Sequence, residues 1–331
     1  MVSATAVVAP PYSPSGSTRL RRPEPRLSPS RRIARYGRSS VSPFLVGEDA
    51  QTLLLSGGGV AGFVRRGRWA IVATEPATPP GTETTALEEL LTQLRGERLH
   101  PIFAAVSDPA PFEALGFHCH PVADDPIIDL RGFTLAGKRR SSVRHSVTSA
   151  QRAGLVVQRF RPEHTAGCAD VSAAWLSTKR GGEMGFTLGR FDPPAMTRTD
   201  CRVAIDADGQ VVGFVTWHSF NAGQARVLDL MRRRPDAPNP TMDLLIGASL
   251  TEFADREIDV ASLGSVPLSH GRLAEHVYPT RSLWRFKDKF APQWQPRYLA
   301  VQSRSALPMA LVAVGRAYSS CGLLGALRRN G

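Results

Sequence analysis

Hydrophobic and polar residues alternate along the chain in blocks that predict two similar series of strands and helices. Apolar residues at every second position, or short apolar runs between turn residues, predict strands, whereas spacings of three and four predict helices. In the first series, strands or hairpins are expected at 52–56, 62–76, 100–106 and 126–130, and helices at 85–99 and 109–117. In the second series, helices are expected at 138–154, 163–180 and 242–257, and strands or hairpins at 155–160, 201–220, 225–233 and 258–265.

The order of these elements favours a mixed α/β architecture with antiparallel hairpins. A doubly wound nucleotide-binding fold would instead alternate strand and helix strictly. We therefore predict a tandem acetyltransferase-like (GNAT) fold, an α/β fold with mixed sheets flanked by helices. The expected units are a disordered basic tail, an N-terminal domain, a C-terminal catalytic domain and a basic helical segment, at 1–42, 43–132, 133–303 and 304–331.

Positive charge is concentrated at the two ends of the chain. Of a formal net charge of +12, residues 1–40 carry +7 (eight Arg, one Glu) and residues 304–331 carry +4 (four Arg, no acid). Such ends suit a polyanion such as RNA or an anionic membrane surface, although Arg-rich tails can also serve solubility alone. We find no convincing signal peptide and no apolar run of about 18 to 20 residues, so a cytoplasmic location is expected.

The sequence offers little for metal or dinucleotide chemistry. The four cysteines form no CxxC pair, and His118-Cys119-His120 is better explained as a half-exposed strand than as a metal site. Gly57, Gly59 and Gly62 match G-x-G-x-x-G, but a strand follows them instead of a helix, which favours a hairpin turn. We expect neither a metal nor a cofactor.

The stretch VLDLMRRRPDAPNPTMDLLIGASL, residues 227–250, carries the main functional signal. In acetyltransferase folds, glycines in the turn between such a strand and helix let backbone N–H groups approach the pyrophosphate of coenzyme A. Here the turn RRRPDAPNPT has no glycine and three prolines, so it lacks donors and flexibility. The acyl-transfer fold is therefore expected to use a different anionic acyl donor.

Aminoacyl-tRNA is an activated, anionic acyl donor that fits this pattern. Asp229, at the end of the strand, is expected to hold the α-ammonium group, and Arg232 a phosphate or the carbonyl oxygen. Asp243 is a candidate substrate-binding residue in the first turn of the helix. The structural alternatives are a strand-end salt bridge for Asp229 and a favourable helix-dipole interaction for Asp243.

Residues 44–303 resemble the C-terminal synthase domain of the phosphatidylglycerol lysyltransferases. The matching motifs are IIDLRGFTLAGKRRSSVRHSVTSAQRAG, DLMRRRPDAPNPTMDLLI, SLGSVPLS and LWRFKDKFAPQWQPRYLAV. The resemblance implies that Asp229 and Arg232 line an aminoacyl pocket, and it makes Ser265 a substrate-binding candidate. It also implies contacts with the tRNA acceptor end from five basic residues: Lys138, Arg144, Arg285, Lys287 and Lys289. A strand over Phe286–Phe290 would present both lysines on one face, although a solvated edge strand would show the same pattern.

We expect a departure from the membrane members of this family, which carry a long multi-helix domain ahead of the matching region. We therefore expect a free-standing enzyme that moves an aminoacyl group, possibly seryl, from tRNA to a small amine, hydroxylamine or hydroxyl acceptor in antibiotic biosynthesis. His270 is the nearest candidate base. DNA is not an expected partner.

Three alternatives stay open on the sequence. The first keeps the chemistry and changes the acceptor to phosphatidylglycerol, with the basic C-terminal segment lying on an anionic membrane. The second is an acetyl-coenzyme-A N-acetyltransferase, which micromolar binding of coenzyme A would favour. The third is a non-catalytic RNA-binding module, in which loss of Asp229 would have no effect.

Overall fold

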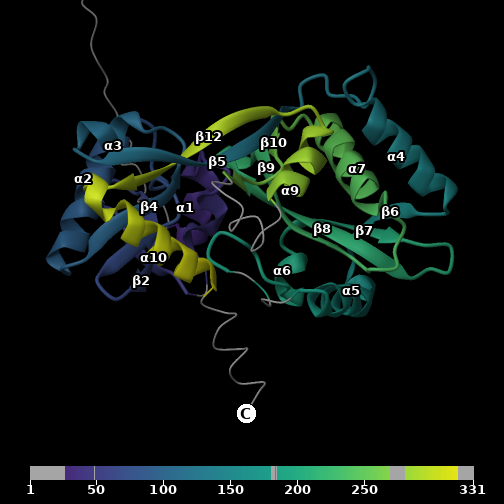
Figure 1. The fold of residues 1–331 in the computed structure, drawn as a ribbon, viewed down its shortest axis with the longest axis horizontal. Coiled ribbons are helices and arrows are strands. Elements are labelled where there is room, and N and C mark those ends of the chain that lie inside the picture. Colours follow the sequence, from purple (N-terminus) through teal and green to yellow (C-terminus); the bar gives the residue numbers. More distant parts are fainter. Residues whose placement is uncertain (1–26, 48, 180–182, 184, 269–279, 320–331) are drawn as a thin grey trace, which may run out of the picture.

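A computed structural model describes residues 27–47, 49–179, 183, 185–268 and 280–319. Its elements form two halves that lie side by side (Figure 1). We define the N-terminal half as residues 27–130 with 293–319, and the C-terminal half as residues 131–290. In the described ranges, no helix is both long and apolar enough to cross a membrane.

Strands of both halves join in one mixed sheet, whereas the sequence suggested separate sheets. The strand order is β1-β2-β3-β4-β12-β5-β10-β9-β8-β7-β6, and β11 pairs with β5. The N-terminal half contributes β1 (Gln51–Leu54), β2 (Val60–Arg66), β3 (Trp69–Val72), β4 (His100–Val106), β5 (His118–Asp129) and β12 (Gln293–Val301). The C-terminal half contributes β6 (Val156–Arg159), β7 (Asp200–Ile205), β8 (Val211–Phe220), β9 (Ala225–Arg233), β10 (Val260–Ser262) and β11 (Val266–Pro267).

Helices flank both faces of this sheet (Figure 1). Those of the N-terminal half are α1 (Pro29–Tyr36), α2 (Glu83–Gly96), α3 (Ala110–Ala114) and α10 (Leu307–Ser319). Those of the C-terminal half are α4 (Ser141–Arg152), α5 (Thr165–Ser177), α6 (Pro193–Met196), α7 (Thr241–Asp255) and α9 (Thr280–Asp288). Short 3-10 helices lie at η1 (Ser42–Leu45), η2 (Pro162–His164), η3 (Asn221–Gly223) and η4 (Arg304–Ala306). The mixed α/β class predicted from the sequence is confirmed.

The two halves repeat one topology. In the first, β1, β2 and β3 are antiparallel and α2 crosses over to the parallel strand β4. In the second, β7, β8 and β9 are antiparallel and α7 crosses over to the parallel strand β10. In both cases the next strand in the sheet is antiparallel and comes from a distant part of the chain. Strand β12 follows β4, and β5 of the N-terminal half follows β10. This is the tandem acetyltransferase-like arrangement.

Each half has an apolar core of its own. Phe103, Phe112 and Phe117 form edge-to-face contacts in the N-terminal half. In the C-terminal half, the fully buried Trp217 packs edge-to-face on Phe253 of α7. Buried aromatic side chains contribute the largest apolar areas, so these clusters fix how the helices sit on the sheet.

Two local predictions were wrong. Residues 27–42 were expected to be disordered, but Ser28 caps α1 and its Ile33 is buried, while residues 1–26 lie outside the described residues. The Phe286–Phe290 stretch was expected to be a strand, but α9 runs through Asp288. Lys287 is buried and donates to Gly264, whereas Lys289 donates to Asp243, so the two lysines point to different partners.

Candidate functional site

A β-bulge in β9 brings Asp229 and Arg232 to the same side of the sheet. Val215 pairs with Met231 and Trp217 with Leu228, so two residues of β9 oppose one residue of β8. Leu228 packs under α7, whereas Leu230 packs in the cluster under α5. In a regular strand, residues three apart face opposite sides. The extra residue cancels this alternation.

The bulge also lies where β9 separates from its parallel neighbour. Pairing between β9 and β10 covers Ala225 to Val227 and stops there, although β9 continues to Arg233. Because β10 ends at Ser262, β9 has no paired strand on this side beyond Val227, and we call this stretch the splayed end of β9. In acetyltransferase-like folds such an opening is the place where the acyl donor lies, so the splayed end of β9 is the candidate site.

His218 and Asp229 form a hydrogen-bonded pair at this opening. His218 Nε2 lies 3.0 Å from Asp229 Oδ2, and the backbone N–H of Gly189 donates to Asp229 Oδ1 at 2.7 Å. The Asp229 side chain is 3% exposed, whereas that of His218 is 30% exposed. The carboxylate is thus held behind the imidazole. With Nε2–H donating to Asp229, Nδ1 keeps its lone pair, which is the arrangement of a general base.

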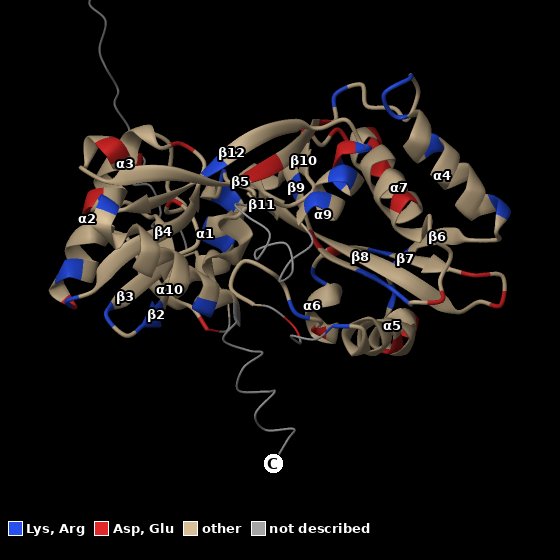
Figure 2. Cartoon of the chain, in the orientation of Figure 1, with Lys and Arg blue, Asp and Glu red and all other residues tan. Residues whose placement is uncertain are grey.

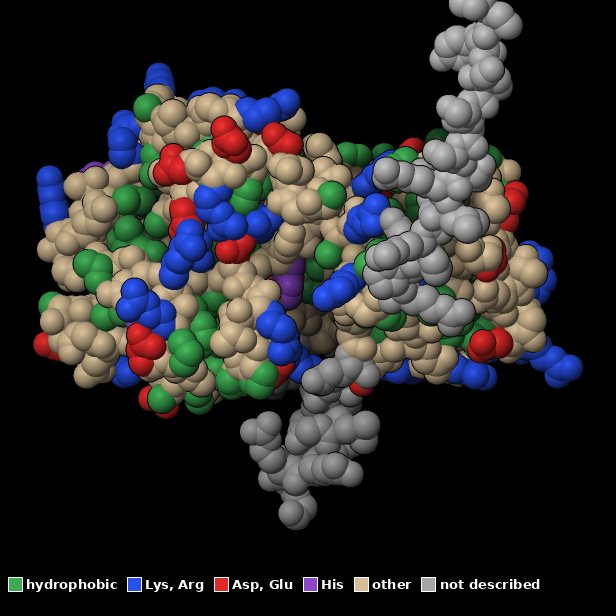
Figure 3. All heavy atoms as spheres, turned by 180° about the vertical axis from the view of Figure 1, so that it is seen from behind, with side chains coloured by type: hydrophobic (Ala, Val, Ile, Leu, Met, Phe, Trp, Pro, Cys, Tyr) green, Lys and Arg blue, Asp and Glu red, His purple; other side chains and the backbone are tan. Residues whose placement is uncertain are grey.

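The same histidine marks the junction of the two halves. Its ring packs edge-to-face on Phe44 of η1, which belongs to the N-terminal half, with 5.4 Å between ring centroids. Figure 3 shows a hollow between the halves that is bordered by Lys and Arg side chains and contains a histidine side chain. A basic border of this kind favours anionic substrates.

Arg232 is buried and holds the loop that supports Asp229. Its guanidinium donates to Glu183 and to the Ser172 hydroxyl, and lies over the Trp175 ring at 4.9 Å. Glu183 also accepts a hydrogen bond from the backbone N–H of Phe191 at 2.9 Å. Arg232 therefore anchors the segment that supplies the Gly189 N–H. It is a positioning residue in this arrangement, not a direct ligand for phosphate.

Gly189→Ala is expected to lower the activity of the site without unfolding the protein. A Cβ at position 189 would lie 1.9 Å from Asp229 Oδ2, so the loop or the carboxylate must move. The displacement breaks the hydrogen bond that orients Asp229, and we expect roughly a ten-fold or greater fall in turnover. Gly96→Ala is the matched control, because a Cβ there meets nothing within 4 Å. Equal turnover in both variants would contradict the role of Gly189.

A second part of the site is a cleft at the N-terminus of α7. Its volume is about 450 Å³ and it lies on the α7 side of the sheet. It is lined by residues of α4, β9, the β9–α7 turn, α7 and the end of α9: His145, Ser146, Ser149, Met231, Arg233, Asn239, Pro240, Met242, Asp243, Phe286 and Lys289. Asp243, in the first turn of α7, accepts a hydrogen bond from Lys289. The cleft is large enough for a nucleoside-sized group.

The turn beside this cleft is stabilised by its own arginines. Arg233 donates to the Ala237 carbonyl oxygen at 2.8 Å, and Arg234 pairs with Asp236 at 3.1 Å. The N–H groups of Arg234 and Ala237 are used within the fold, and the three prolines have none. Few backbone donors remain for a pyrophosphate, which agrees with the sequence argument against coenzyme A.

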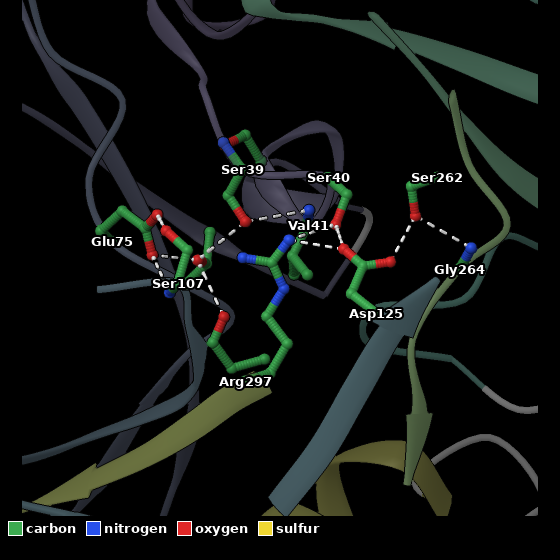
Figure 4. Close-up of polar contacts among 12 residues, drawn as sticks. Ser39, Ser40, Val41, Glu75, Ser107, Asp125, Ser262, Gly264 and Arg297 are labelled. Atoms are coloured by element: carbon green, nitrogen blue, oxygen red, sulfur yellow. Dashed lines mark hydrogen bonds and ion pairs between the residues drawn. The ribbon is translucent and has the colours of Figure 1, made fainter. Parts of the chain in front are cut away.

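A buried polar network joins the halves next to the opening (Figure 4). The fully buried Asp125 of β5 accepts hydrogen bonds from Ser40 and Ser262, each at 2.5 Å, and pairs with Arg297 of β12 at 2.5 Å. Ser262 in turn accepts from the Gly264 N–H at 3.0 Å. A single carboxylate thus connects the N-terminal segment, β5, β10 and β12.

Lys287 extends this network from α9. Its ammonium group donates to the Gly264 carbonyl oxygen at 2.7 Å and is buried. Gly264 has φ of +81°, and a Cβ there would lie 3.1 Å from the Leu228 carbonyl oxygen, so this close approach requires glycine. Burial lowers the pKa of Lys287 to about 7, and the nearby Asp125 opposes that shift.

Lys287→Met is expected to change how stability depends on pH. The pKa of Lys287 falls from 10.5 to about 7 on folding, so between these values the unfolded chain binds more protons. Wild-type stability should therefore rise relative to Lys287→Met between about pH 7 and pH 10. Urea unfolding across this range measures the difference, with Lys138→Met as the control for loss of an exposed lysine. Parallel pH curves for the wild type and Lys287→Met would refute the shift.

The remaining predicted residues lie in different parts of the C-terminal half. Lys138 and Arg144 are exposed near the start of α4, and Arg144 donates to the Leu135 carbonyl oxygen at 2.9 Å. Arg285 lines a separate cavity of about 230 Å³ beside α9. Ser265 follows Gly264, and its buried hydroxyl makes no hydrogen bond among the described residues.

The candidate base named from the sequence differs from the one in the structure. His270 lies outside the described residues, whereas His218 is paired with Asp229. His218 carried no sequence motif, and it is eleven positions from Asp229. The hairpin 201–220 and the strand 225–233 were both predicted, so their antiparallel pairing could have suggested this neighbour. No cluster of three or more potential metal ligands occurs within the described ranges.

Taken together, the repeated topology and the splayed, bulged strand define a protein with a tandem acetyltransferase-like fold. The family model for the C-terminal region of phosphatidylglycerol lysyltransferase matches residues 30–301. The chain therefore belongs to this family.

Curated relatives match most of this chain. Phosphatidylglycerol lysyltransferase of Bacillus subtilis is 25% identical over 297 residues, which cover 82% of this chain and 34% of that protein. The bifunctional lysylphosphatidylglycerol biosynthesis protein LysX of Mycobacterium ulcerans is 28% identical over 309 residues. This match covers 84% of this chain and 28% of LysX. The chain thus spans about a third of these relatives.

Solved structures support the fold. The C-terminal DUF2156 domain of an Agrobacterium fabrum protein superimposes with a TM-score of 0.76 at 22% identity, covering 88% of this chain and 98% of that one. The structure of L-PGS from Bacillus licheniformis gives 0.74 at 24% identity, covering 84% and 92%. At these identities the likeness concerns the fold alone.

Proposed function

We propose that this chain transfers an aminoacyl group from aminoacyl-tRNA to a hydroxyl group of phosphatidylglycerol. The family match over residues 30–301 carries this proposal. The relatives are named for phosphatidylglycerol, so they favour the lipid acceptor over the small amine or hydroxylamine expected from the sequence. The amino acid is left to experiment, with lysine first because the relatives are lysyltransferases.

The splayed end of β9 supplies a route for the donor. We place the 3′-terminal adenosine in the cleft beside α7, where Met231 and Phe286 offer apolar contacts and Arg233 a positive charge. The aminoacyl ester would then reach through the opening beyond Val227 toward His218. Lys138 and Arg144, exposed near this cleft's α4 side, would contact the phosphates of the acceptor end.

His218 and Asp229 supply the proton transfers. The acceptor hydroxyl oxygen attacks the ester carbonyl carbon and gives its proton to His218 Nδ1. The bond from the carbonyl carbon to the ribose oxygen then breaks, and His218 returns the proton to that oxygen. Asp229 holds the ring orientation and stabilises the charged imidazolium. Its carboxylate is already engaged by Gly189 and His218, so we assign it this role and not contact with the α-ammonium.

This proposal is tested by varying the donor and the acceptor independently of each other. The protein is incubated with radiolabelled lysyl-, alanyl- or seryl-tRNA and either phosphatidylglycerol or a panel of small amines. We expect a labelled lipid that disappears when the donor is first treated with RNase. Label in the amines alone would support the acceptor expected from the sequence, and acetyl transfer from acetyl-coenzyme A with inactive tRNA donors would overturn the proposal.

A further inference from the structure

Helix α10 is apolar on two opposite sides. Its sequence, LPMALVAVGRAYS, has Arg316 as its single charged residue. A surface helix normally shows one apolar stripe and a polar outer face. The outer face of α10 is apolar where a polar face is expected, so a function of this surface should explain it. The helix also lies beyond residue 301, where the family match ends.

The inner side of α10 is accounted for by packing on the N-terminal half. Ala310, Ala313 and Ala317 are buried against a cluster that includes Ile71, Ile102 and Leu299. Small alanines let the helix lie close to the sheet. This side fixes the helix and defines which residues remain on the outside.

The outer side exposes large apolar side chains to solvent. Met309, Leu311 and Val312 are 55%, 50% and 47% exposed. Pro308 and Gly315 lie on the same side and add no polar group. Contiguous exposed apolar surface with a polar rim commonly marks an interaction site.

The rim of this surface is basic. Arg304 and Arg316 flank the exposed residues on either end, and both are exposed. The β2–β3 hairpin, which contacts α10, carries Arg65, Arg66 and Arg68 and no acidic residue between Val60 and Val72. Figure 2 colours the turn of this hairpin blue for its Lys and Arg positions, near α10 in that view. Apolar residues flanked by arginine are the composition of a helix that lies in the interface of an anionic membrane.

We propose that the outer face of α10 docks on an anionic lipid surface. This inference rests on the proposed function, because the acceptor would be a lipid of that surface. Met309, Leu311 and Val312 enter the boundary between headgroups and acyl chains. The arginines of α10 and the hairpin pair with lipid phosphates.

The end of α10 contacts the loop of the candidate site. The backbone N–H of Gly185 donates to the Tyr318 carbonyl oxygen at 3.2 Å, and the Thr187 and Tyr318 hydroxyls are 2.6 Å apart. Phe186 packs edge-to-face on Tyr318. The same segment supplies the Gly189 N–H to Asp229.

Vesicle co-sedimentation of the full chain tests this proposal. The vesicles contain either equal parts of phosphatidylglycerol and phosphatidylcholine or phosphatidylcholine alone. We expect binding to the anionic vesicles. The combined variant Met309→Ser, Leu311→Ser, Val312→Ser should lower the partition coefficient by about ten-fold or more, and Arg304→Gln with Arg316→Gln should lower it less.

The matched control removes exposed apolar side chains elsewhere. Leu54→Ser with Val156→Ser changes residues that are 54% and 51% exposed and belong to β1 and β6. This control should bind vesicles like the wild type, and thermal melting should show that all variants are folded. No vesicle binding by the wild type, or equal loss in the control, overturns the proposal. So does an α10 variant that loses binding of tRNA while keeping vesicle binding.

A water-soluble short-chain phosphatidylglycerol separates docking from chemistry. With this acceptor, the α10 serine variant should transfer at the wild-type rate, whereas with vesicles it should be slower by the factor lost in binding. If the wild type binds vesicles but transfers to neither form of the lipid, the proposed function fails and the docking surface stands. Equal loss of transfer with both acceptors would show that α10 acts on the site and not through docking.

Discussion

Replacing His218 with Gln is expected to lower aminoacyl transfer by about 10²- to 10⁴-fold. Gln can fill much of the imidazole's space but cannot accept and return a proton. Because the side chain is part of the chemical step and not of donor binding, kcat should fall while KM stays near the wild-type value. Single-turnover transfer from aminoacyl-tRNA to phosphatidylglycerol measures this effect.

Two further variants make the prediction specific. Asp229→Asn should also lower the transfer rate strongly, because an amide can donate a hydrogen bond to His218 Nε2 and favour the wrong tautomer. His100→Gln is the matched control, since His100 is exposed at the start of β4 and distant in sequence from the opening. If the His218 and His100 variants transfer at similar rates, His218 is not the base.

Asp125→Ala is expected to have the largest effect on stability. Asp125 is fully buried, and its removal leaves Arg297, 4% exposed, without its ion-pair partner. Removing one member of a buried pair costs about 3 to 5 kcal/mol in the free energy of unfolding. A fall in Tm of roughly 10 °C should result, and chemical denaturation measures the free energy directly.

A control variant and a rescue variant test whether burial of the Asp125–Arg297 pair causes this loss of stability. Asp208→Ala, in the exposed β7–β8 turn, should change the free energy of unfolding by less than about 0.5 kcal/mol. Asp125→Leu combined with Arg297→Met should recover most of the loss, because replacing a buried pair by apolar residues is often nearly neutral. If Asp125→Ala were as stable as Asp208→Ala, the network would not join the halves.

Periodic elements could be predicted from the sequence because local spacing determines them. The helix at Glu83–Gly96 follows from apolar spacings of three and four, and the strand at His100–Val106 from a short, continuous apolar run. The proline-rich turn after Arg233 was also readable, since proline restricts the backbone wherever it occurs.

Short or compositionally biased segments could not be predicted in this way. Phe286–Phe290 places two lysines two positions apart between two phenylalanines, and five positions are too few to separate a strand from a helix. Residues 27–42 are rich in Arg and Ser, yet burial of Ile33 against the N-terminal core gives α1 its stability. Local composition says nothing about such a tertiary contact.

The placement of strands that are distant in the chain, and the bulge in β9, also could not be predicted from the sequence. Strand β12 lies between β4 and β5, although it was assigned to the C-terminal domain. Asp229 was identified, but its partner His218 was not, because their contact depends on register and on the extra residue in β9. A one-residue shift in register would turn either side chain to the other face.

The central claim is that the aminoacyl ester lies at the splayed end of β9, within reach of His218. A crystal structure with a non-hydrolysable aminoacylamino-adenosine tests this most directly. The proposal predicts adenosine in the cleft lined by Met231 and Phe286, and the analogue's reacting carbonyl near His218, at hydrogen-bond distance or one water away. An analogue bound in the cleft with its aminoacyl group directed away from His218 would contradict the account.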